Sequence, residues 1–199
     1  MDGKPLTRVE AKSATRDRVV RTASRAMRRD GIAGTGVAAV MAEAGLTHGG
    51  FYAHFKSKDA LAGAAIDAAF AESARRIAGE VDAMPPAAAL AGWIDLYVAA
   101  RHRDDRAGGC ALTALSGEAA RGGAIARAAL ASGADRLTAR LAQWLAAIGD
   151  ADPGGTAAAL LAEAVGTVTL ARIHGATPAS DALLAAARAS LRRRAGITG

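Results

Sequence analysis

Residues 45–61 read Gly-Leu-Thr-His-Gly-Gly-Phe-Tyr-Ala-His-Phe-Lys-Ser-Lys-Asp-Ala-Leu, and the rest of the chain is organised around them. Gly45 predicts the end of one short helix, because glycine adopts left-handed backbone angles without the steric cost of a Cβ atom. Thr47 is a suitable N-cap for a second, very short helix. Phe51 and Phe55 lie four residues apart, so both are expected to face inward.

The other faces of this short helix carry polar or small groups, and the next helix begins with a cation. Ser57 is predicted to cap that next helix, which places Lys58 in its first turn. The helix dipole disfavours a cation at an N-terminus, whereas a nearby phosphate would reverse that preference. The stretch is therefore expected to contact an external anion.

Two motifs carry a resemblance to a known family. The pattern Thr-x-Gly-x-Phe-Tyr-x-His-Phe-x-Ser-Lys-Asp-x-Leu, at residues 47–61, closely resembles the recognition helix of the tetracycline-repressor (TetR) family, and residues 35–42 resemble its preceding helix. The chain departs from the family pattern at Ala38 and Ala39, where an acidic residue is common, and at Met41, which replaces an alanine. None of these changes removes a DNA-facing group, so they bear on helix stability.

The resemblance is specific over residues 19–61, and it implies a homodimeric DNA-binding transcription regulator. Such a protein is a repressor that a small-molecule effector releases from an inverted-repeat operator in double-stranded DNA. The resemblance implies phosphate contacts from Thr35, Thr47 and Tyr52, with Lys58 beside them at the start of the following helix.

Base readout is implied for the first residues of the same short helix. His48 and Gly50 are expected to approach base edges, and Gly49 to allow close approach of the backbone. His54 is either a phosphate donor or a packed structural histidine. In a helix-turn-helix unit the second helix lies in the major groove.

The composition favours closely packed helices. Hydrophobic residues make up 51% of the 199-residue chain but aromatic residues only 4%, and the abundant alanine is the best helix former and a poor strand former. The periodicity predicts an all-α fold of about nine helices. A charged N-terminus without an apolar signal region, interrupted apolar runs and a single cysteine favour a cytoplasmic protein.

The positive charge is concentrated near the N-terminus. Residues 1–60 hold 11 Lys and Arg against 6 Asp and Glu, a net charge of +5, whereas residues 61–199 hold 14 against 13, a net charge of +1. This asymmetry is typical of a nucleic-acid footprint. We expect a helix-turn-helix DNA-binding domain over residues 1–60, with residues 1–14 as a flexible basic arm. Residues 61–199 are expected to bind the effector and to dimerise.

The first helix is predicted over residues 15–30, with Gly31 as its stop. Apolar residues at helical spacing form its core stripe, namely Val19, Ala23, Ala26 and Met27. The other side carries five arginines, Arg18, Arg21, Arg25, Arg28 and Arg29. These arginines are either a solvated face or a set of phosphate contacts.

The C-terminal part is a series of helices separated by glycine and proline. A helix over residues 58–82 is expected to connect the two domains, and Pro85 and Pro86 end it. Further helices are predicted over residues 87–102, 111–121, 123–148, 156–174 and 177–194. The mixed charges of residues 101–106 are expected to be solvated.

The second-last helix is apolar on more than one side, so it must be buried on nearly all sides. In a chain of this size a second subunit is the simplest cover. The expected dimer interface comprises Leu161, Val165 and Val168 on this helix, with Leu184 and Leu191 on the last one.

The effector site is implied by the resemblance rather than by periodicity. Trp93 and Tyr97 lie four residues apart on one helix face, as either ordinary core or the lining of a ligand cavity. We expect that cavity among the helices of residues 87–174, with Cys110 lining it as well. A lone cysteine is usually a small buried hydrophobe, although His102 nearby in the sequence also fits a redox or metal sensor.

Catalytic motifs do not occur in the sequence. The glycine pairs form neither a P-loop nor a dinucleotide fingerprint, and the four histidines lack the spacing of zinc ligands. We therefore expect no enzymatic activity, no metal and no cofactor. The alternative is a helical enzyme or small-molecule carrier with an incidental basic N-terminus, which a convergent acid–base pair in the C-terminal bundle would favour.

Overall fold

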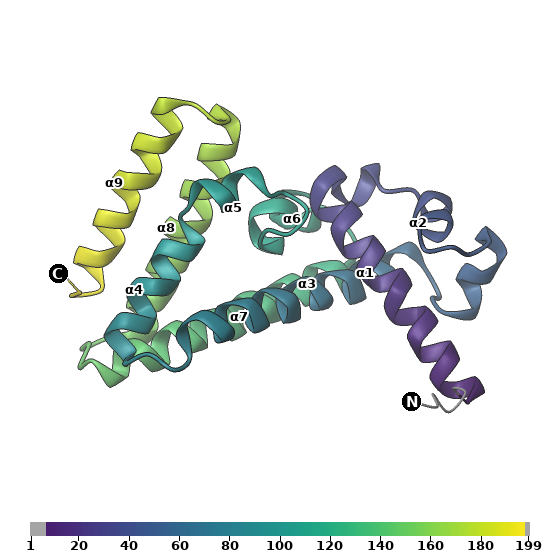
Figure 1. The fold of residues 1–199 in the computed structure, drawn as a ribbon, viewed down its shortest axis with the longest axis horizontal. Helices are drawn as coiled ribbons and strands as arrows, with labels where there is room; N and C mark the ends of the chain where they lie inside the picture. Colours follow the sequence, from purple (N-terminus) through teal and green to yellow (C-terminus); the bar gives the residue numbers. More distant parts are fainter. Residues whose placement is uncertain (1–6, 198–199) are drawn as a thin grey trace, which may run out of the picture.

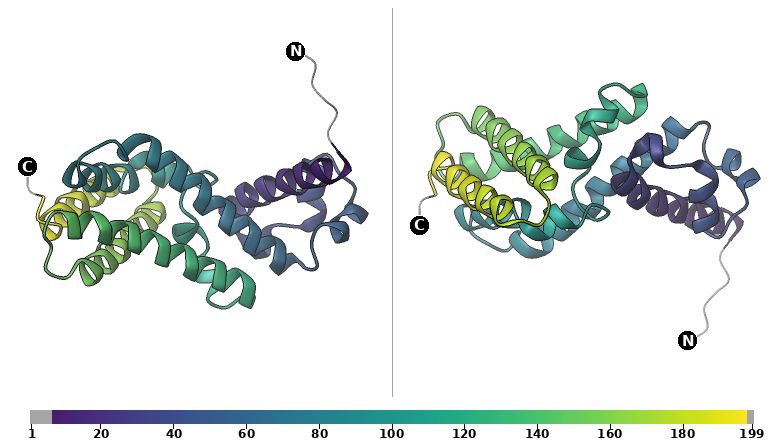
Figure 2. Two further views of the ribbon diagram at one scale, coloured as in Figure 1. Left: turned by 90° about the horizontal axis from the view of Figure 1, so that it is seen from below. Right: turned by 90° about the horizontal axis from the view of Figure 1, so that it is seen from above.

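The computed structural model describes residues 7–197, and over this range the chain forms nine α-helices, one 3-10 helix and no strand. The all-α prediction is confirmed. Figure 1 shows α1, α2 and η1 at one end of the molecule and α8 and α9 at the other. Two long helices, α3 and α7, lie side by side between the ends, and the views of Figure 2 show the same elongated arrangement.

The N-terminal unit comprises α1 (Arg8–Gly34), α2 (Val37–Glu43) and η1 (His48–Ala53). α1 begins at Arg8 rather than near Thr15, because Thr7 and Glu10 form a capping box. The backbone N–H of Thr7 donates to Oε2 of Glu10 over 2.8 Å, and the N–H of Glu10 donates to Oγ1 of Thr7 over 3.3 Å. The predicted basic arm is therefore wrong for residues 7–14, and residues 1–6 lie outside the described range.

Glycines shape the path of this unit at two points. Gly31 has φ 84° and ψ 162°, so it breaks α1 where a stop was predicted, although one more helical turn follows to Gly34. Gly45 has φ 72° and ends α2 as predicted. Its N–H bonds the carbonyl of Ala42 and the N–H of Leu46 bonds that of Met41, both over 2.9 Å, which is a Schellman motif.

The remaining helices are α3 (Lys58–Val81), α4 (Pro86–Tyr97), α5 (Ala100–Asp104), α6 (Ala111–Ala119), α7 (Ala124–Ala147), α8 (Pro153–His174) and α9 (Pro178–Arg194). The single helix predicted over residues 87–102 is wrong, because it breaks into α4 and α5. The ring nitrogen Nδ1 of His102 lies 2.6 Å from the carbonyl oxygen of Tyr97. That bond occupies the acceptor that a continuing α-helix would use.

The charged run that follows α4 is not solvated as predicted. His102 is 6% exposed and Arg103 is 5% exposed. Nη1 of Arg103 donates to Oγ of Ser180 over 2.9 Å and to Oδ1 of Asp181 over 2.7 Å. These bonds fix α5 to the first turn of α9.

One face of α8 is buried and the opposite face is exposed. Leu160, Ala164 and Val168 lie in the core, whereas Leu170 is 51% exposed and Ile173 is 77% exposed. Within residues 7–197, α8 alone is long and apolar enough to cross a membrane, a criterion that core helices of soluble proteins also meet. The exposed face is the largest apolar feature of this end of the molecule.

Candidate DNA-binding surface and effector cavity

The recognition unit is built on two buried rings. Phe51 and Phe55 are 2% and 4% exposed, and their rings stack with centroids 5.8 Å apart, as the four-residue spacing predicts. Tyr52 packs edge-on against Phe51 at 5.2 Å but remains 73% exposed. The buried pair therefore holds a short 3-10 helix whose tyrosine points to solvent.

The first residues of η1 present polar groups to solvent. Thr47, His48 and Gly49 are exposed. Thr47 occupies the predicted N-cap position, but its hydroxyl forms no capping bond within the chain. Gly50 is half-buried, and a Cβ atom there would lie 3.6 Å from Cε of Met41, so this glycine also serves the packing of η1 on α2.

Thr35 and Lys58 have structural bonds at the end of α1. Thr35 is 5% exposed, and its Oγ1 donates to the carbonyl of Gly31 over 2.7 Å. Nζ of Lys58 donates to the carbonyl of Ala33 over 3.2 Å. Ser57 caps α3 as predicted, accepting from the N–H of Ala60 over 3.0 Å.

Basic groups flank η1 on the side of α1. His54 is half-buried, and its Nδ1 has no hydrogen-bond partner. It lines a surface hollow with Arg8 and Lys12, residues that the sequence analysis had assigned to a flexible arm. Of the five arginines predicted on one face of α1, Arg28 is instead 3% exposed and belongs to the interior.

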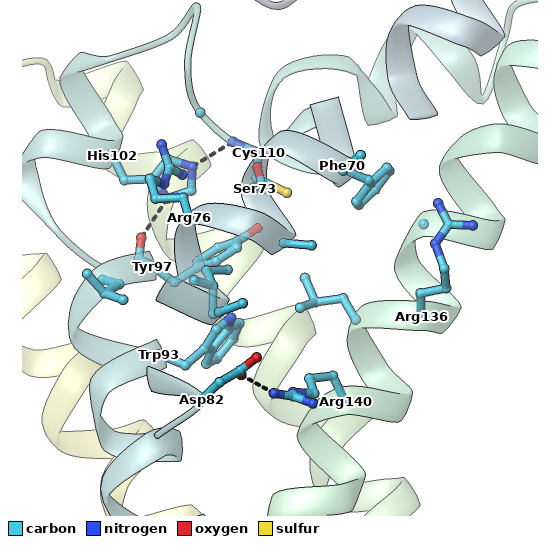
Figure 3. A pocket seen from close by; sticks show the side chains of 18 of the residues that line it. Phe70, Ser73, Arg76, Asp82, Trp93, Tyr97, His102, Cys110, Arg136 and Arg140 are labelled. Atoms are coloured by element: carbon cyan, nitrogen blue, oxygen red, sulfur yellow. Dashed lines mark hydrogen bonds and ion pairs between the residues drawn. The ribbon is translucent and has the colours of Figure 1, made fainter. Parts of the chain in front are cut away.

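A cavity of about 740 Å³ lies at the other end of α3 (Figure 3). Its walls come from α3, α4, α5, the turn at residues 108–110 and α7. Trp93, Tyr97 and Cys110 all line it. The prediction had placed a pocket among the helices of residues 87–174, which omits α3, and α8 contributes no lining residue.

Aromatic side chains are concentrated around this cavity. The chain has seven aromatic residues, counting Trp 2, Tyr 2 and Phe 3, and four of them, Phe70, Trp93, Tyr97 and Trp144, line the cavity. The rings of Trp93 and Tyr97 lie 5.0 Å apart. The other three aromatics form the recognition unit, so every aromatic ring of the chain belongs to one of two places.

Three buried polar atoms of the cavity wall have no hydrogen-bond partner: Oγ of Ser73, Nε1 of Trp93 and Oη of Tyr97. Leaving such a group unpaired costs about 1–3 kcal/mol. Figure 3 shows these side chains on the α3–α4 side of the cavity, with Arg136 and Arg140 on α7. Sequence reasoning missed Ser73, Phe70 and Trp144, because their meeting depends on how α3 and α7 pack.

His102 and Cys110 close one end of the cavity as a neutral pair. The N–H of Cys110 donates to Nε2 of His102 over 2.9 Å, so Nδ1 carries the proton that bonds Tyr97. Burial lowers the pKa of His102 to about 4, despite its bond to the Tyr97 carbonyl. Burial also raises the pKa of the Cys110 thiol, and burial together with the neighbouring Cys110 raises the pKa of Tyr97.

Charges at the rim of the cavity are largely paired with one another. Arg140 forms an ion pair with Asp82, Arg136 lies 3.5 Å from Asp67, and Arg101 lies 3.6 Å from Glu80. Arg136 and Arg140 also cover the faces of Phe70 and Trp144 at 5.8 Å and 4.9 Å. No group of three or more potential metal ligands occurs in the described part of the chain.

Buried contacts link the turn beside the cavity to α1. Nη1 of Arg28 donates to the carbonyl of Gly109 over 2.9 Å, and its Nη2 donates to Oε2 of Glu72 over 2.6 Å. Oε2 of Glu118, on α6, accepts from the N–H groups of Ile32 and Ala33 over 2.6 Å and 3.0 Å. The cavity therefore contacts the N-terminal unit both through α3 and through α1.

This arrangement, a helix-turn-helix unit joined by one long helix to a helical bundle, defines a class of DNA-binding regulators. Residues 19–65 match the sequence model of the family described as "Bacterial regulatory proteins, tetR family". By this domain and by its fold, the chain belongs to the TetR family of transcriptional regulators.

Solved structures of regulators share the fold over nearly the whole chain. A TetR transcriptional regulator from Chloroflexus aurantiacus J-10-FL is 26% identical, with a TM-score of 0.78 over 92% of this chain and 94% of that one. A TetR-family regulator from Cytophaga hutchinsonii is 20% identical, with a TM-score of 0.79 over 97% of each chain. The reduced form of NemR from E. coli is 22% identical, with a TM-score of 0.77 over 90% of this chain and 96% of that one. No curated protein matches the chain.

Proposed function

We propose that this transcription regulator is a homodimeric, cytoplasmic repressor that an effector in the α3–α7 cavity releases from an inverted-repeat operator. Residues 1–60 would bind DNA, and residues 61–199 would hold the effector and the dimer interface. The observation that supports operator binding most directly is the exposed tyrosine and polar N-terminus of η1, held rigidly by two buried phenylalanines.

The proposed DNA contacts are narrower than the sequence alone suggested. Thr47 and Tyr52 remain candidates for phosphate contacts, and His48 and Gly49 for base edges, because they are exposed. Thr35 is no longer included, since its side chain is buried and its hydroxyl proton is given to Gly31. Gly50 would bring the backbone close through its packing on α2.

Two cations extend the proposed phosphate-binding surface. His54 lies in a hollow with Arg8 and Lys12, which adds positive charge on the α1 side of η1. Lys58 can reach a phosphate only by giving up its bond to the Ala33 carbonyl. Its contribution to binding is therefore expected to be smaller than a free lysine's.

The dimer interface that we propose is the exposed face of α8. Leu161, Val168, Leu184 and Leu191 are at most 6% exposed within one chain, so a partner has little of them to cover, and Val165 is half-buried. The residues available to a second copy are Val165, Ala162, Gly166, Leu170 and Ile173. Ile173→Glu should yield folded monomers, whereas Val168→Glu should unfold the chain; a folded dimer of Ile173→Glu in light scattering would refute this interface.

The alternative of a helical enzyme depends on a convergent acid–base pair in the bundle. His102 is the histidine at the cavity, and both of its ring nitrogens are bonded to backbone groups. Oδ1 of Asp105 accepts from the N–H of Gly108 over 2.8 Å. The two groups thus have structural bonds, which favours a binding cavity over a reaction site.

The operator is testable without knowing its sequence. Genomic DNA fragments would be selected by the purified full chain, and the enriched site would then be titrated at several salt concentrations. His48→Ala should change the base preference, whereas Tyr52→Phe should weaken binding to all sequences alike. Arg75→Ala, an exposed change on α3, serves as the control. Failure to enrich any site, with the protein folded, would refute the proposal.

A further inference from the structure

We infer that the cavity is built for an uncharged aromatic molecule that carries a hydrogen-bond-accepting carbonyl oxygen, an aryl ketone or quinone. This inference names the class of the effector and rests on the proposed function only for its consequence at the operator. It depends on three features of the cavity wall: unpaired donors, balanced rim charge and concentrated aromatic rings.

The unpaired groups require an acceptor from the ligand. Nε1 of the Trp93 indole can only donate, and Trp93 is 0% exposed. Tyr97 is 5% exposed, and its hydroxyl faces only the thiol of Cys110, a weak hydrogen-bonding group. Ser73 adds a third unpaired hydroxyl. A hydrocarbon would bury all three groups without a partner, whereas a carbonyl oxygen with two lone pairs can accept from them.

The charges around the cavity favour a neutral ligand. Its lining includes four arginines, Arg76, Arg101, Arg136 and Arg140, and three aspartates, Asp67, Asp82 and Asp105. Three of the arginines are paired with carboxylates, and Arg76 donates to the carbonyl of Gly108 over 3.2 Å. His102 is neutral because its pKa lies near 4. A carboxylate beside Trp93 would therefore lose its hydration without gaining an ion pair.

The apolar walls favour a ring system rather than a chain. Four aromatic side chains from α3, α4 and α7 line the cavity, and a volume of about 740 Å³ lies within the range of small-molecule sites. Aromatic ligands stack on such rings with a favourable geometry, at little cost in conformational entropy. Aliphatic lining residues, Ile77, Leu96 and Leu137, complete the walls.

Three probes of nearly equal shape separate these requirements. 2-Acetylnaphthalene supplies the ring and the carbonyl oxygen, 2-isopropenylnaphthalene replaces that oxygen by a methylene group, and 2-naphthoate replaces the methyl group by a charged oxygen. Each would be titrated into the full chain by calorimetry at pH 7. The ketone should bind about tenfold more tightly than either of the others, because it alone satisfies the buried donors without burying a charge.

Conservative variants then assign the acceptor contact. Tyr97→Phe and Trp93→Phe each remove a donor and keep a ring, and Ser73→Ala removes the third hydroxyl. At least one of them should lower ketone affinity roughly two- to tenfold and leave the affinity of the alkene unchanged. Ser116→Ala, on an exposed part of α6, should change neither affinity.

The outcomes separate the ligand class from the regulatory role. Equal affinity for the ketone and the alkene, or tighter binding of the naphthoate, overturns the inference. A ketone preference that all three variants leave unchanged also overturns it, because the oxygen then lies elsewhere. Tight, donor-dependent ketone binding that leaves operator affinity unchanged upholds the inference and refutes release by an effector in this cavity.

Discussion

The seven aromatic residues form two clusters, and the clusters differ in how they use their polar groups. In the recognition unit, two phenylalanines are buried and Tyr52 extends into solvent. Around the cavity, the rings of Trp93 and Tyr97 are buried with their polar atoms still unpaired. The first cluster closes a small core and presents a surface. The second surrounds space and leaves hydrogen bonds to be completed by a ligand.

The clusters also differ in how far apart their members lie along the chain. The recognition cluster comes from residues 51–55, so local spacing specifies it. The cavity cluster draws on residues 70, 93, 97 and 144, which meet only through the packing of three helices. Local patterns therefore expose a DNA-binding surface, whereas a ligand cavity emerges from tertiary contacts.

The largest expected effect tests whether the two clusters are independent. Phe51→Ala should destabilise the recognition unit by about 3–5 kcal/mol, because it leaves a void beside Phe55. Operator binding should be lost, and proteolysis should cleave the chain within residues 45–57. Affinity for the ketone probe should stay within about twofold, since the cavity lies on later turns of α3. Loss of both activities together would contradict the separation.

An exposed change in the same cluster provides the control. Tyr52→Ala leaves the buried pair in place, so the chain should resist proteolysis as the wild type does. Its operator affinity should nevertheless fall. If Tyr52→Ala is cleaved as readily as Phe51→Ala, the tyrosine serves packing rather than DNA contact.

A pH effect distinguishes the cavity end of the molecule. The pKa of His102 is lowered from 6.5 to about 4 by burial, so the folded chain prefers the neutral ring. The resulting stability is fully present above pH 6.5 and is lost as pH falls towards 4, by about 3 kcal/mol in all. Urea unfolding at pH 7 and pH 4.5 measures the loss. His102→Gln removes the titrating group, and an equal loss in that variant would contradict the assignment.

Much of the fold was predictable because its signals are local. The Schellman motif at Gly45, the Ser57 cap and the buried Phe51–Phe55 pair all follow from spacing, and the helix of residues 58–82 matches α3. The early start of α1 was also encoded, in the Thr7–Glu10 capping box, but it was read as a basic arm.

What the sequence did not specify depends on contacts between distant residues. The break after Tyr97 follows from a ring nitrogen five positions later, and the burial of Arg103 follows from its bonds to α9. Arg28 looks like one more surface arginine until the turn at Gly109 packs on it. Trp93, Tyr97 and Cys110 were named from helical spacing and resemblance, whereas Ser73, Phe70 and Trp144 needed the structure.

A third prediction concerns the connection between the two clusters. Arg28→Met removes the bonds from α1 to Gly109 and Glu72 but keeps an apolar stem of similar length. Effector-free operator binding should be nearly unchanged, because Arg28 is buried away from the DNA-binding surface. The effect of the bound ligand on operator affinity, typically about five- to 150-fold for coupled sites, should shrink towards none.

Arg29→Met is the matched control for that variant. Arg29 is the next residue on α1, and its ion pair with Asp30 is exposed, so its loss should cost less than about 1 kcal/mol and leave the coupling intact. If Arg28→Met responds to the ligand as the wild type does, the coupling runs through α3 alone.

The smallest expected effect tests whether the cavity cluster is open because a glycine keeps it so. A Cβ atom at Gly133, on α7, would overlap the ring of Phe70, and the end of that side chain is free to move only by shifting towards the cavity. Gly133→Ala should raise helix propensity by about 0.5–1 kcal/mol and spend much of that gain on moving the ring. The midpoint of urea unfolding should therefore change little, while ketone affinity falls several-fold. Gly117→Ala, on exposed α6 with no atom within 4 Å of the new Cβ, should stabilise the chain without affecting the ligand. Unchanged ketone affinity in Gly133→Ala would show that Phe70 does not border the bound molecule, and the binding site would then be confined to the Trp93–Tyr97 side.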